Sequence, residues 1–304
     1  MASNRDRKTG SRGAMLRGLL GSALAGAVLL GAAPAFAQFG GGGCTREMLQ
    51  TSVDQYLQAQ AEADPTKIRT GEWVQYFQDG KEASLLTGIV MTPLKIDFHR
   101  SLLDTQSCQS FTEVVVTDPA HPYVLGVALQ NRGPGVGQIT TLVTDHDKGW
   151  LFNAANTLKY SKAEDWSPIP EGQRDSRDAL IAAASAYLDL FNDKTVQVPW
   201  GSPCARLEGG LYTGKGAPGQ ATPQDSCNVG VPSGVKITDR RFIVDPELGA
   251  VTALVTFGDN QLPDAHTFRI EHGKIRYVHT ITVCKTFNCG FKLPEQLQQT
   301  ASAK

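Results

Sequence analysis

The sequence lacks the short motifs that mark most metal-dependent and phosphate-binding enzymes. It has no C-x-x-C pair, no H-x-H or H-x-x-x-H spacing, no G-x-S-x-G nucleophile turn and no P-loop. Its glycine-rich segment NRGPGVGQ lies between two strand-like runs, which favours a hairpin turn over a phosphate-binding loop. We therefore expect neither a bound metal nor a cofactor.

Long apolar runs are also scarce, and only the one near the N-terminus has the length of a targeting signal. GLLGSALAGAVLLGAA follows a basic segment and ends shortly before Ala35-Phe36-Ala37, an A-x-A cleavage pattern. This arrangement predicts a signal peptide over residues 1–37, cleaved after Ala37, and a secreted or periplasmic protein. A membrane anchor is the alternative, but the run is short for a span and is interrupted by glycines.

Clustered positive charge is missing as well. Removing residues 1–37 takes away five basic residues and one acidic residue, which leaves 24 Lys and Arg against 29 Asp and Glu. A mildly acidic chain without basic runs is poorly suited to phosphate backbones, because neutralising phosphates requires clustered Lys and Arg. We expect no nucleic-acid partner and no membrane partner.

Cysteine is present in an even number, and all six cysteines lie after the expected cleavage site. In an exported chain this favours disulfides, although six cysteines allow 15 pairings. Cys204 and Cys227 flank the Gly/Pro/Thr-rich segment TGKGAPGQATPQDS, so we expect them to form one bridge. Cys44–Cys108 and Cys284–Cys289 complete the set that we expect. Structural zinc is the alternative, but its usual ligand spacings are missing.

Two segments of the chain resemble each other. REMLQTSVDQYLQAQAEAD begins at Arg46 and RDALIAAASAYLDLFNDK begins at Arg177, and both have the apolar spacing of an amphipathic helix. Their Tyr-Leu pairs begin at Tyr56 and Tyr187, at the same offset as the two arginines. The pattern indicates two copies of one unit.

Two further landmarks extend this repeat. The segments EVVVTDPAHPYVLGVALQN and RRFIVDPELGAVTALVTFGDN both read as strand, Asp-Pro turn and strand, which pairs Asp118 with Asp245. Gly137 and Gly273 open two later strands in the same order. We predict repeat units over residues 44–153 and 177–289, a Pro-containing linker over 154–176 and a tail over 290–304.

The helix followed by long strands predicts an α+β fold, and particular segments of the second copy resemble a known fold family. ASAYLDLFNDK, ARLEGG and DAHTFRIEHGKIRYVHTI are similar to the NTF2-like fold, in particular its SnoaL-like and ketosteroid-isomerase-like members. The resemblance implies two tandem cone-shaped units, each with a curved antiparallel sheet over helices. It also implies an apolar pocket inside the cone, which relatives use for cofactor-free proton transfer, hydration, cyclisation or lyase chemistry, or for binding alone.

A second resemblance covers nearly the whole mature chain. CTREMLQ, PLKIDFHRSLLDTQSC, VPWGSPCARLEGG, DSCNVGVPSGVKI and LPDAHTFRIEHGKIRYVHTITVC are similar to a secreted, mostly fungal family of unknown function. The signal peptide of this chain has a bacterial pattern, which departs from that setting. The resemblance brings no activity with it.

Polar residues on strands of the second copy are the candidate catalytic residues. Arg206 and Glu208 alternate onto one face of a strand, where they form either a polar pocket floor or a structural ion pair. His266 shares a face with Phe268 and is either a general base or a satisfied core histidine. We assign His266 as the base, Arg206 as the group that stabilises negative charge, and Glu208 as the group that orients one of them.

Further residues are candidates for substrate binding. His279, on the last strand, meets His266 across the sheet if both face inward. Asp97, His99 and Arg100 lie together before Cys108, where they bind substrate oxygens or fasten the local fold. Trp200 represents the aromatic residues near strand ends, which suit an aromatic ligand if they line the mouth of a cone.

These observations favour a secreted, cofactor-independent acid/base enzyme that cleaves or rearranges a small aromatic or hydrophobic molecule. Hydrolysis or elimination fits an exported catabolic protein, and lignin-derived aryl ethers are one substrate class. The first alternative is a non-catalytic binding protein for a small hydrophobic ligand. A second is a structural module in which one copy has a filled cone. A homodimer is one assembly to test.

Overall fold

The computed structural model describes residues 43–133 and 135–298. The signal peptide expected over residues 1–37, and its cleavage after Ala37, lie outside the described residues. Contacts group the described part of the chain into one compact unit, in which both repeats take part. None of the helices in residues 43–133 and 135–298 has the length and apolar character needed to cross a bilayer.

The first repeat begins with helix α1 (Arg46–Glu62), which starts where the Thr45 side chain accepts a hydrogen bond from the Met48 amide. A short 3₁₀ turn, η1 (Pro65–Lys67), leads to the sheet, and two more, η2 (Leu85–Thr87) and η3 (Ile89–Met91), follow β2. Its strands are β1 (Thr70–Gln78), β2 (Lys81–Glu82), β3 (Phe98–Asp104), β4 (Gln109–Val116), β5 (Tyr123–Arg132) and β6 (Gly135–Thr144).

The second repeat begins with helix α3 (Arg177–Asp189), which is capped in the same way by Ser176. Between the repeats lie α2 (Ala154–Ala163) and η4 (Glu171–Gln173), so part of the expected linker is helical. The strands are β7 (Trp200–Glu208), β8 (Leu211–Tyr212), β9 (Ile237–Asp245), β10 (Ala250–Phe257), β11 (Leu262–Glu271) and β12 (Lys274–Thr282). η5 (Pro246–Leu248) joins β9 to β10, and η6 (Phe287–Gly290) and α4 (Glu295–Gln298) follow β12.

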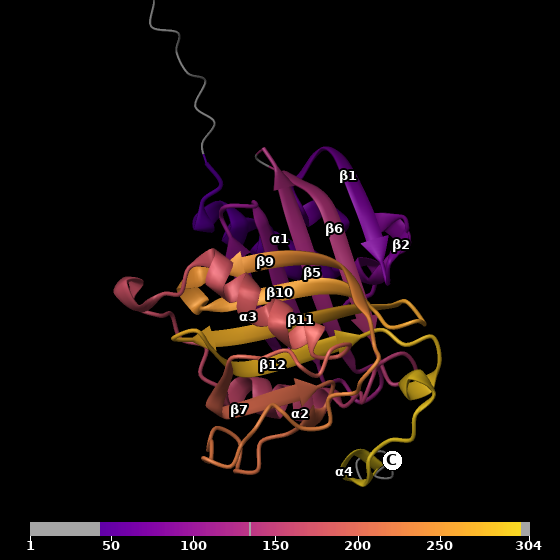
Figure 1. Cartoon of the computed structure of the whole chain (residues 1–304). Coiled ribbons are helices and arrows are strands. Elements are labelled where there is room, and N and C mark those ends of the chain that lie inside the picture. Colours follow the sequence, from indigo (N-terminus) through magenta and orange to yellow (C-terminus); the bar gives the residue numbers. More distant parts are fainter. Residues whose placement is uncertain (1–42, 134, 299–304) are drawn as a thin grey trace, which may run out of the picture. The chain divides into compact units, whose positions relative to one another are not determined.

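The described strands form two six-stranded sheets with the same strand order, β2-β1-β6-β5-β4-β3 and β8-β7-β12-β11-β10-β9 (Figure 1). This confirms the predicted α+β fold class with two tandem units of the same topology. One detail differs from an all-antiparallel sheet: β1 pairs with β6, and β7 with β12, in parallel. The reason is the chain path, which crosses from β2 or β8 to the opposite edge of the sheet before the antiparallel strands begin.

The repeat is real, but two of its three sequence landmarks were aligned wrongly. Tyr56 and Tyr187 do correspond, because each is buried on the first helix of its repeat. Asp245 ends β9, and its counterpart is Asp104 at the end of β3, whereas Asp118 lies in the turn after β4. Asp118 and Asp245 both precede a proline, and this likeness shifts the predicted alignment of the two repeats by one strand. Gly137 lies inside β6 while Gly273 precedes β12, so that pair does not correspond either.

Each helix packs on one face of its own sheet, and the other faces of the two sheets pack on each other. Leu49 of α1 and Leu180 of α3 are fully buried against the sheets. Burying each such side chain contributes about 1.5–3 kcal/mol to the free energy of unfolding. The cluster between the sheets mixes both repeats, with Phe111 and Val115 from β4 against Leu254 and Ile281. The inner faces, between helix and sheet, are therefore where a pocket can form in each repeat.

Three disulfides join Cys44 to Cys108, Cys204 to Cys227 and Cys284 to Cys289. All three predicted pairings are confirmed. No described cysteine is free. Such a set is typical of proteins that fold in an oxidising compartment.

Candidate functional site

The second repeat holds a cavity of about 500 Å³ between its helix-covered sheet face and the loops around it. Its polar lining comes from Arg206, Glu208, Asp259, Asn260, Asp264, His266, Thr280 and Thr282. Its apolar lining includes Trp150, Phe191, Pro232, Val235, Phe257, Leu262 and Phe291. The three residues expected to be catalytic, Arg206, Glu208 and His266, thus face one space.

Arg206 and Glu208 form an ion pair on β7, with Arg206 Nε 3.3 Å from Glu208 Oε1. The guanidinium also donates to the Tyr187 hydroxyl, at 3.3 Å, and to the Val229 carbonyl. Burial alone would lower the pKa of Arg206, but Glu208 and the Tyr187 hydroxyl together outweigh it and raise the pKa. The side chain of Glu208 keeps 18% of its surface exposed, so its carboxylate is open to the cavity.

The turn after Glu208 requires its two glycines. Gly209 has a φ of +57°, and a Cβ on it would lie 2.1 Å from the carbonyl oxygen of Trp150. Gly210 donates its amide to the Leu151 carbonyl at 2.7 Å. The sequence LEGG therefore brings the end of β7 against the Trp150–Leu151 turn, which supplies one wall of the cavity.

A buried Asp–His pair on β11 faces Glu208 across the cavity floor. His266 Nδ1 lies 3.3 Å from Asp264 Oδ2, and both side chains are almost completely buried. Burial raises the pKa of Asp264 well above its usual range. Burial, and then the charge of Arg206, lower the pKa of His266 to about 3. His266 is therefore uncharged at neutral pH, and burial favours the uncharged form of Asp264 as well.

Asp264 was not among the expected site residues. The signal was present in the sequence, because Asp264 is two positions before His266 and a strand places such residues on one face.

The strand register sets the spacing of these groups. His266 is paired with Thr280 on β12, and Thr280 is paired in turn with Glu208 on β7. The three side chains form a row across the sheet, and the two outer ones are two strand spacings apart, roughly 9.5 Å. A small molecule over Thr280 would lie between a carboxylate and the Asp–His pair.

Aromatic rings surround the imidazole and mark the opening of the cavity. The ring of His266 lies within 5.7–6.4 Å of those of Tyr187, Phe191, Phe257 and Phe268. At the opening, Phe291 is 63% exposed and makes an edge contact with Trp150, with ring centres 5.3 Å apart.

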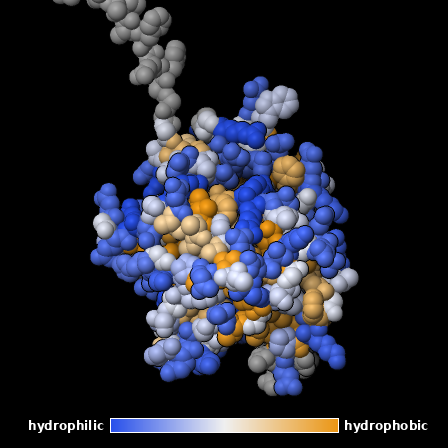
Figure 2. All heavy atoms as spheres, in the orientation of Figure 1, coloured by the Kyte–Doolittle hydropathy of each residue, from blue (hydrophilic) through white to orange (hydrophobic). Residues whose placement is uncertain are grey.

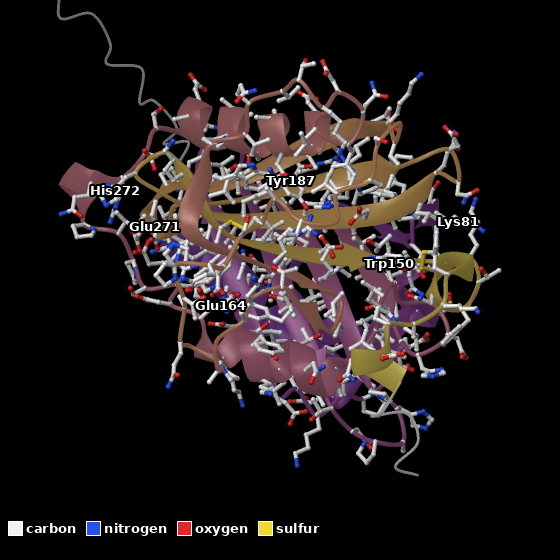
Figure 3. The ribbon with its side chains drawn as sticks, turned by 60° about the horizontal axis from the view of Figure 1, so that its bottom comes forward. Lys81, Trp150, Glu164, Tyr187, Glu271 and His272 are labelled. Carbon is white, nitrogen blue, oxygen red and sulfur yellow. A yellow bond between two sulfur atoms is a disulfide. The ribbon has the colours of Figure 1, made fainter. Side chains whose placement is uncertain are left out.

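Figures 2 and 3 show the surroundings of this opening. Hydrophobic surface lies close to the C-terminal segment at the lower edge of the face in Figure 2. In Figure 3, Trp150 lies next to that segment, drawn in yellow, and Tyr187 points from α3 toward the strands. The opening therefore lies where the C-terminal segment meets the turn after β6.

The same positions in the first repeat carry a different set of side chains. Matching the two registers places Leu125 and Val127 where the second repeat has Asp264 and His266. Tyr76 and Gln78 stand in the places of Arg206 and Glu208. The first repeat therefore has no counterpart of the Asp264–His266 pair, and an amide replaces the carboxylate of Glu208.

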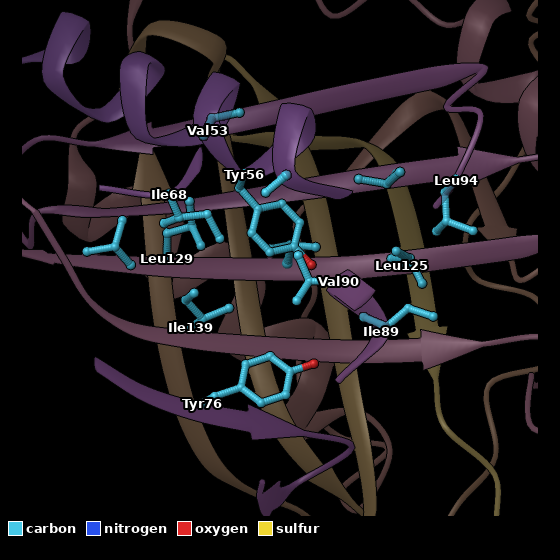
Figure 4. Packing of buried hydrophobic residues seen from close by; sticks show 14 of the residues in the cluster. Val53, Tyr56, Ile68, Tyr76, Ile89, Val90, Leu94, Leu125, Leu129 and Ile139 are labelled. Atoms are coloured by element: carbon cyan, nitrogen blue, oxygen red, sulfur yellow. The ribbon is translucent and has the colours of Figure 1, made fainter. Parts of the chain in front are cut away.

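A segment between β2 and β3 fills the interior of the first repeat (Figure 4). We refer to residues 85–91 as the plug. Ile89 and Val90 of the plug pack among the buried residues under α1. Gln60, which stands where the second repeat has Phe191, donates to the carbonyls of Ile89 and Thr92 at 2.9 and 2.8 Å. The first repeat is thus filled and the second is open, as in the alternative in which one copy has a filled cone.

His279 lies on the face of β12 opposite to the cavity. Because the register pairs His266 with Thr280 and Thr267 with His279, the two histidines cannot meet. The expectation that they do is wrong, since adjacent residues of a strand point to opposite faces. His279 lies between the sheets, 3.1 Å from Glu113 and 2.7 Å from Glu164. Burial alone would lower its pKa, but Glu164 and Glu113 outweigh it and raise the pKa to about 9.

The remaining candidates do not line the cavity. Asp97 fastens a turn by accepting bonds from Thr117, and its neighbour His99 is exposed. Arg100 joins the buried charges between the sheets, with its guanidinium 3.8 Å from Glu113 and 4.2 Å above the Trp166 ring. Trp200 packs against Tyr187 in the core under α3. Asp97, Arg100 and Trp200 thus make structural contacts that a sequence pattern could not reveal.

Across the described ranges, no group of three or more His, Cys, Asp or Glu side chains is arranged to hold a metal ion. Arg206 and the Asp264–His266 pair offer hydrogen-bond donors and acceptors instead. The arrangement can hold a polar group of a ligand and can move protons to and from it.

Residues 173–282 match the model of a domain of unknown function (DUF8021), which covers the second repeat. No curated protein matches the chain. An NTF-2 like protein of unknown function from Burkholderia xenovorans LB400 is similar in structure, at 14% identity and a TM-score of 0.26. The similarity covers 33% of this chain and 84% of that chain. At that TM-score the likeness decides nothing about the site, and the fold class rests on the matching strand orders.

Proposed function

We propose that the second repeat is a cofactor-independent acid/base catalyst for a small aromatic or otherwise hydrophobic molecule, in an exported protein. The observation that carries the proposal is the row of Glu208, Thr280 and His266, which lines one aromatic-walled cavity. Groups that accept and donate protons on two sides of a substrate are what general acid–base catalysis requires. The three disulfides and the expected signal peptide support export.

The electrostatics favour roles different from those expected from the sequence. With a pKa of about 3, His266 is a weak proton acceptor at neutral pH. We assign Glu208 as the proton acceptor, because its partly exposed carboxylate lines the cavity. The raised pKa of Asp264 favours its protonated form, and we assign the Asp264–His266 pair as the acid.

Aryl ethers, including those derived from lignin, are the substrate class to test first. Glu208 takes a proton from the carbon next to the ether-bearing carbon. The C–O bond then breaks as a C=C bond forms, and the leaving aryloxide takes the proton of the Asp264–His266 pair. The products are an alkene and a phenol, and exchange with water restores both carboxyl groups.

Phenol release by the purified mature protein tests this proposal. The substrates are neutral aryl ethers with a carbonyl that makes the neighbouring C–H acidic. E208Q should lower kcat by about 10²–10⁴, the usual loss for a positioned proton-transfer group. E72Q, at an exposed position of β1, is the matched control and should leave the rate unchanged. Equal rates for E208Q and the wild type would remove Glu208 from the mechanism.

A binding protein is the second candidate function. Two observations favour it: the low pKa of His266, and the fact that Arg206 and Glu208 already pair with each other. Saturable binding of aryl ethers without any turnover, in a protein whose E208Q variant binds equally well, would favour the carrier over the enzyme.

A further inference from the structure

Polar atoms without partners gather at the buried end of the cavity in the second repeat. Within the described residues, twelve buried side-chain nitrogen and oxygen atoms lack a hydrogen bond, and five of them belong to residues that line this cavity. The five are Arg206 Nε, both carboxyl oxygens of Asp264, His266 Nδ1 and Thr280 Oγ1. Buried polar atoms are normally paired, so this concentration indicates a missing ligand group or water.

The neighbours of these atoms do not satisfy them. His266 Nδ1 and Arg206 Nε lie 3.3 Å from carboxyl oxygens of Asp264 and Glu208, but neither contact is aligned as a hydrogen bond. Thr282 and the Ala265 amide lie close enough to Asp264 to favour its ionised form, again without good alignment. These atoms can therefore form hydrogen bonds with a group that enters the space between β7 and β11.

In the first repeat, the residues at the matching positions form hydrogen bonds within the protein. Thr141, in the place of Thr280, is 3.0 Å from the Tyr76 hydroxyl and donates to the Phe77 carbonyl at 3.3 Å. Gln78, in the place of Glu208, accepts from Tyr76 and from the Ile89 amide at 2.6 and 2.8 Å. The plug supplies that last donor. In the second repeat the corresponding space is the cavity, so a ligand can supply what the plug supplies in the first.

The charge of the buried end is balanced. Arg206 and Glu208 neutralise each other at 3.3 Å. Burial lowers the pKa of His266 to about 3, so this group adds no charge near neutral pH, and burial also raises the pKa of Asp264, which favours its uncharged form. A carboxylate or ammonium group entering this end would lose its hydration without meeting a free counter-charge.

We propose that the buried end of this cavity binds an uncharged hydroxyl or carbonyl group of its ligand, whose aromatic or alicyclic body lies against Phe191 and Phe257. Thr280 and the Asp264–His266 pair bond to the oxygen, and the body extends toward Trp150 and Phe291 at the opening. This inference rests on the proposed function, whose site it shares, and it adds the chemical class of the ligand.

Binding of four naphthalenes to the purified mature protein at pH 7 tests this class. Naphthalene, 2-naphthol, 2-naphthoate and 2-naphthylmethylammonium share one ring system and differ in the polar group. We expect calorimetry and naphthyl fluorescence to give a Kd for 2-naphthol at least tenfold below that of each of the other three. A site whose buried polar groups need a hydrogen-bond partner from the ligand discriminates strongly against analogues that lack that partner.

Three variants link that preference to the cavity floor. T280V removes the unpartnered hydroxyl with little change of shape and should reduce the preference for 2-naphthol over naphthalene several-fold. T280S keeps the hydroxyl and should bind 2-naphthol with the preference of the wild type. T141V, at the matching position of the plugged first repeat, should leave all four affinities unchanged.

The outcomes separate this inference from the proposed function. If naphthalene binds as tightly as 2-naphthol, or if 2-naphthoate binds most tightly, the uncharged oxygen site is wrong while an aromatic-binding cavity stands. If none of the four binds, the cavity does not accept an aromatic body, and the inference and the proposed function both fail. A preference that survives in T280V and changes in T141V would place the oxygen site elsewhere and overturn the assignment.

Discussion

Arg46 of the first repeat forms a two-pronged ion pair with Asp245 of the second, at 2.7 and 3.1 Å. The reciprocal pair joins Arg177 of the second repeat to Asp104 of the first at 2.7 Å. Each carboxylate also accepts a backbone amide from the other repeat at 2.9 Å, from Leu103 and Val244 respectively. The repeats therefore dock through the same contacts made twice, as two copies related by a two-fold axis would.

These reciprocal contacts should be important for stability. Asp245 and Asp104 are buried, and the loss of either breaks an ion pair with an arginine and leaves the buried backbone amide of Leu103 or Val244 without its carboxylate partner. We expect D245A and D104A each to lower the free energy of unfolding by roughly 3 kcal/mol. Urea denaturation of the mature protein measures it.

Asp118 provides the control for this prediction. It also follows a strand and precedes a proline, but it only fastens an exposed turn through the Ala120 amide. D118A should change the free energy of unfolding by less than about 1 kcal/mol. If D245A and D118A are equally mild, the reciprocal contacts do not hold the repeats together.

The fold was largely accessible from the sequence, because helix periodicity and a repeated Tyr-Leu are local signals. The Cys204–Cys227 disulfide followed from the composition of the loop between these cysteines, whereas no sequence pattern singled out the other two pairings. The docking of the repeats was not accessible, since Arg46 and Asp245 are far apart in the chain and no local pattern pairs them. The same limit applies to the plug, whose role depends on Gln60 in a distant helix.

The candidate site was predicted only in part, for a related reason. Strand alternation correctly grouped Arg206 with Glu208, and the structure adds Asp264 beside His266. Alternation does not say which face is which, so His279 was placed toward the ligand although it faces the other sheet. Arg100 was likewise grouped with its sequence neighbours, while its contacts are with Glu113 and Trp166.

His279 should make stability fall in alkaline solution. Its pKa is raised to about 9 in the folded protein from an ordinary value near 6.5. The stabilisation is therefore complete below about pH 6.5 and is lost as the pH rises through about 9. Its size is on the order of 3 kcal/mol. Urea denaturation at pH 6.5, 8 and 9.5 measures the loss.

Replacing the histidine should remove that dependence. H279Q lacks the titrating group, so its stability should be lower at pH 6.5 and nearly constant up to pH 9.5. H99Q, at an exposed position of β3, should keep the alkaline loss of the wild type. A wild-type stability that does not change over this range would show that His279 is not held charged by Glu113 and Glu164.

Two phenylalanines near the C-terminal disulfide should have different effects on ligand binding. Phe291 lines the cavity and contacts Trp150, whereas Phe287 is also exposed but contacts the His146 ring. F291A should weaken binding of 2-naphthol by about tenfold, since an aromatic contact and its buried area are worth roughly 1–2 kcal/mol. F287A should bind as the wild type does. Equal losses in both variants would mean that the opening lies elsewhere.

The loop closed by Cys204 and Cys227 should become mobile when the bridge is removed. Asp225 also orders this loop by accepting from Lys215 and Thr222. The C204S/C227S double variant should lose about 3 kcal/mol of stability, and hydrogen exchange should rise first between residues 214 and 226. Unchanged exchange in that segment would show that Asp225 alone keeps it ordered.

His266 should make the wild type lose stability in acid. Comparison with H266F separates the effect of its titration from the effect of its packing. The folded pKa of about 3 lies below the ordinary value near 6.5, so between these values the unfolded chain binds the proton first. The wild type should therefore lose about 2 kcal/mol from this group between pH 7 and pH 5. H266F keeps a ring among Phe257 and Phe268 but cannot titrate, so it should lose correspondingly less.

The same variant tests the role of His266 in the site. Because Phe fills the space of the imidazole without a hydrogen-bonding atom, H266F should fold, keep naphthalene binding and lose the preference for 2-naphthol. Turnover of any aryl ether should fall by about 10²–10⁴ if His266 and Asp264 together supply the proton. A stable H266F protein with normal turnover and an unchanged preference would make His266 a core residue, and would leave Asp264 and Glu208 as the groups that act on the ligand.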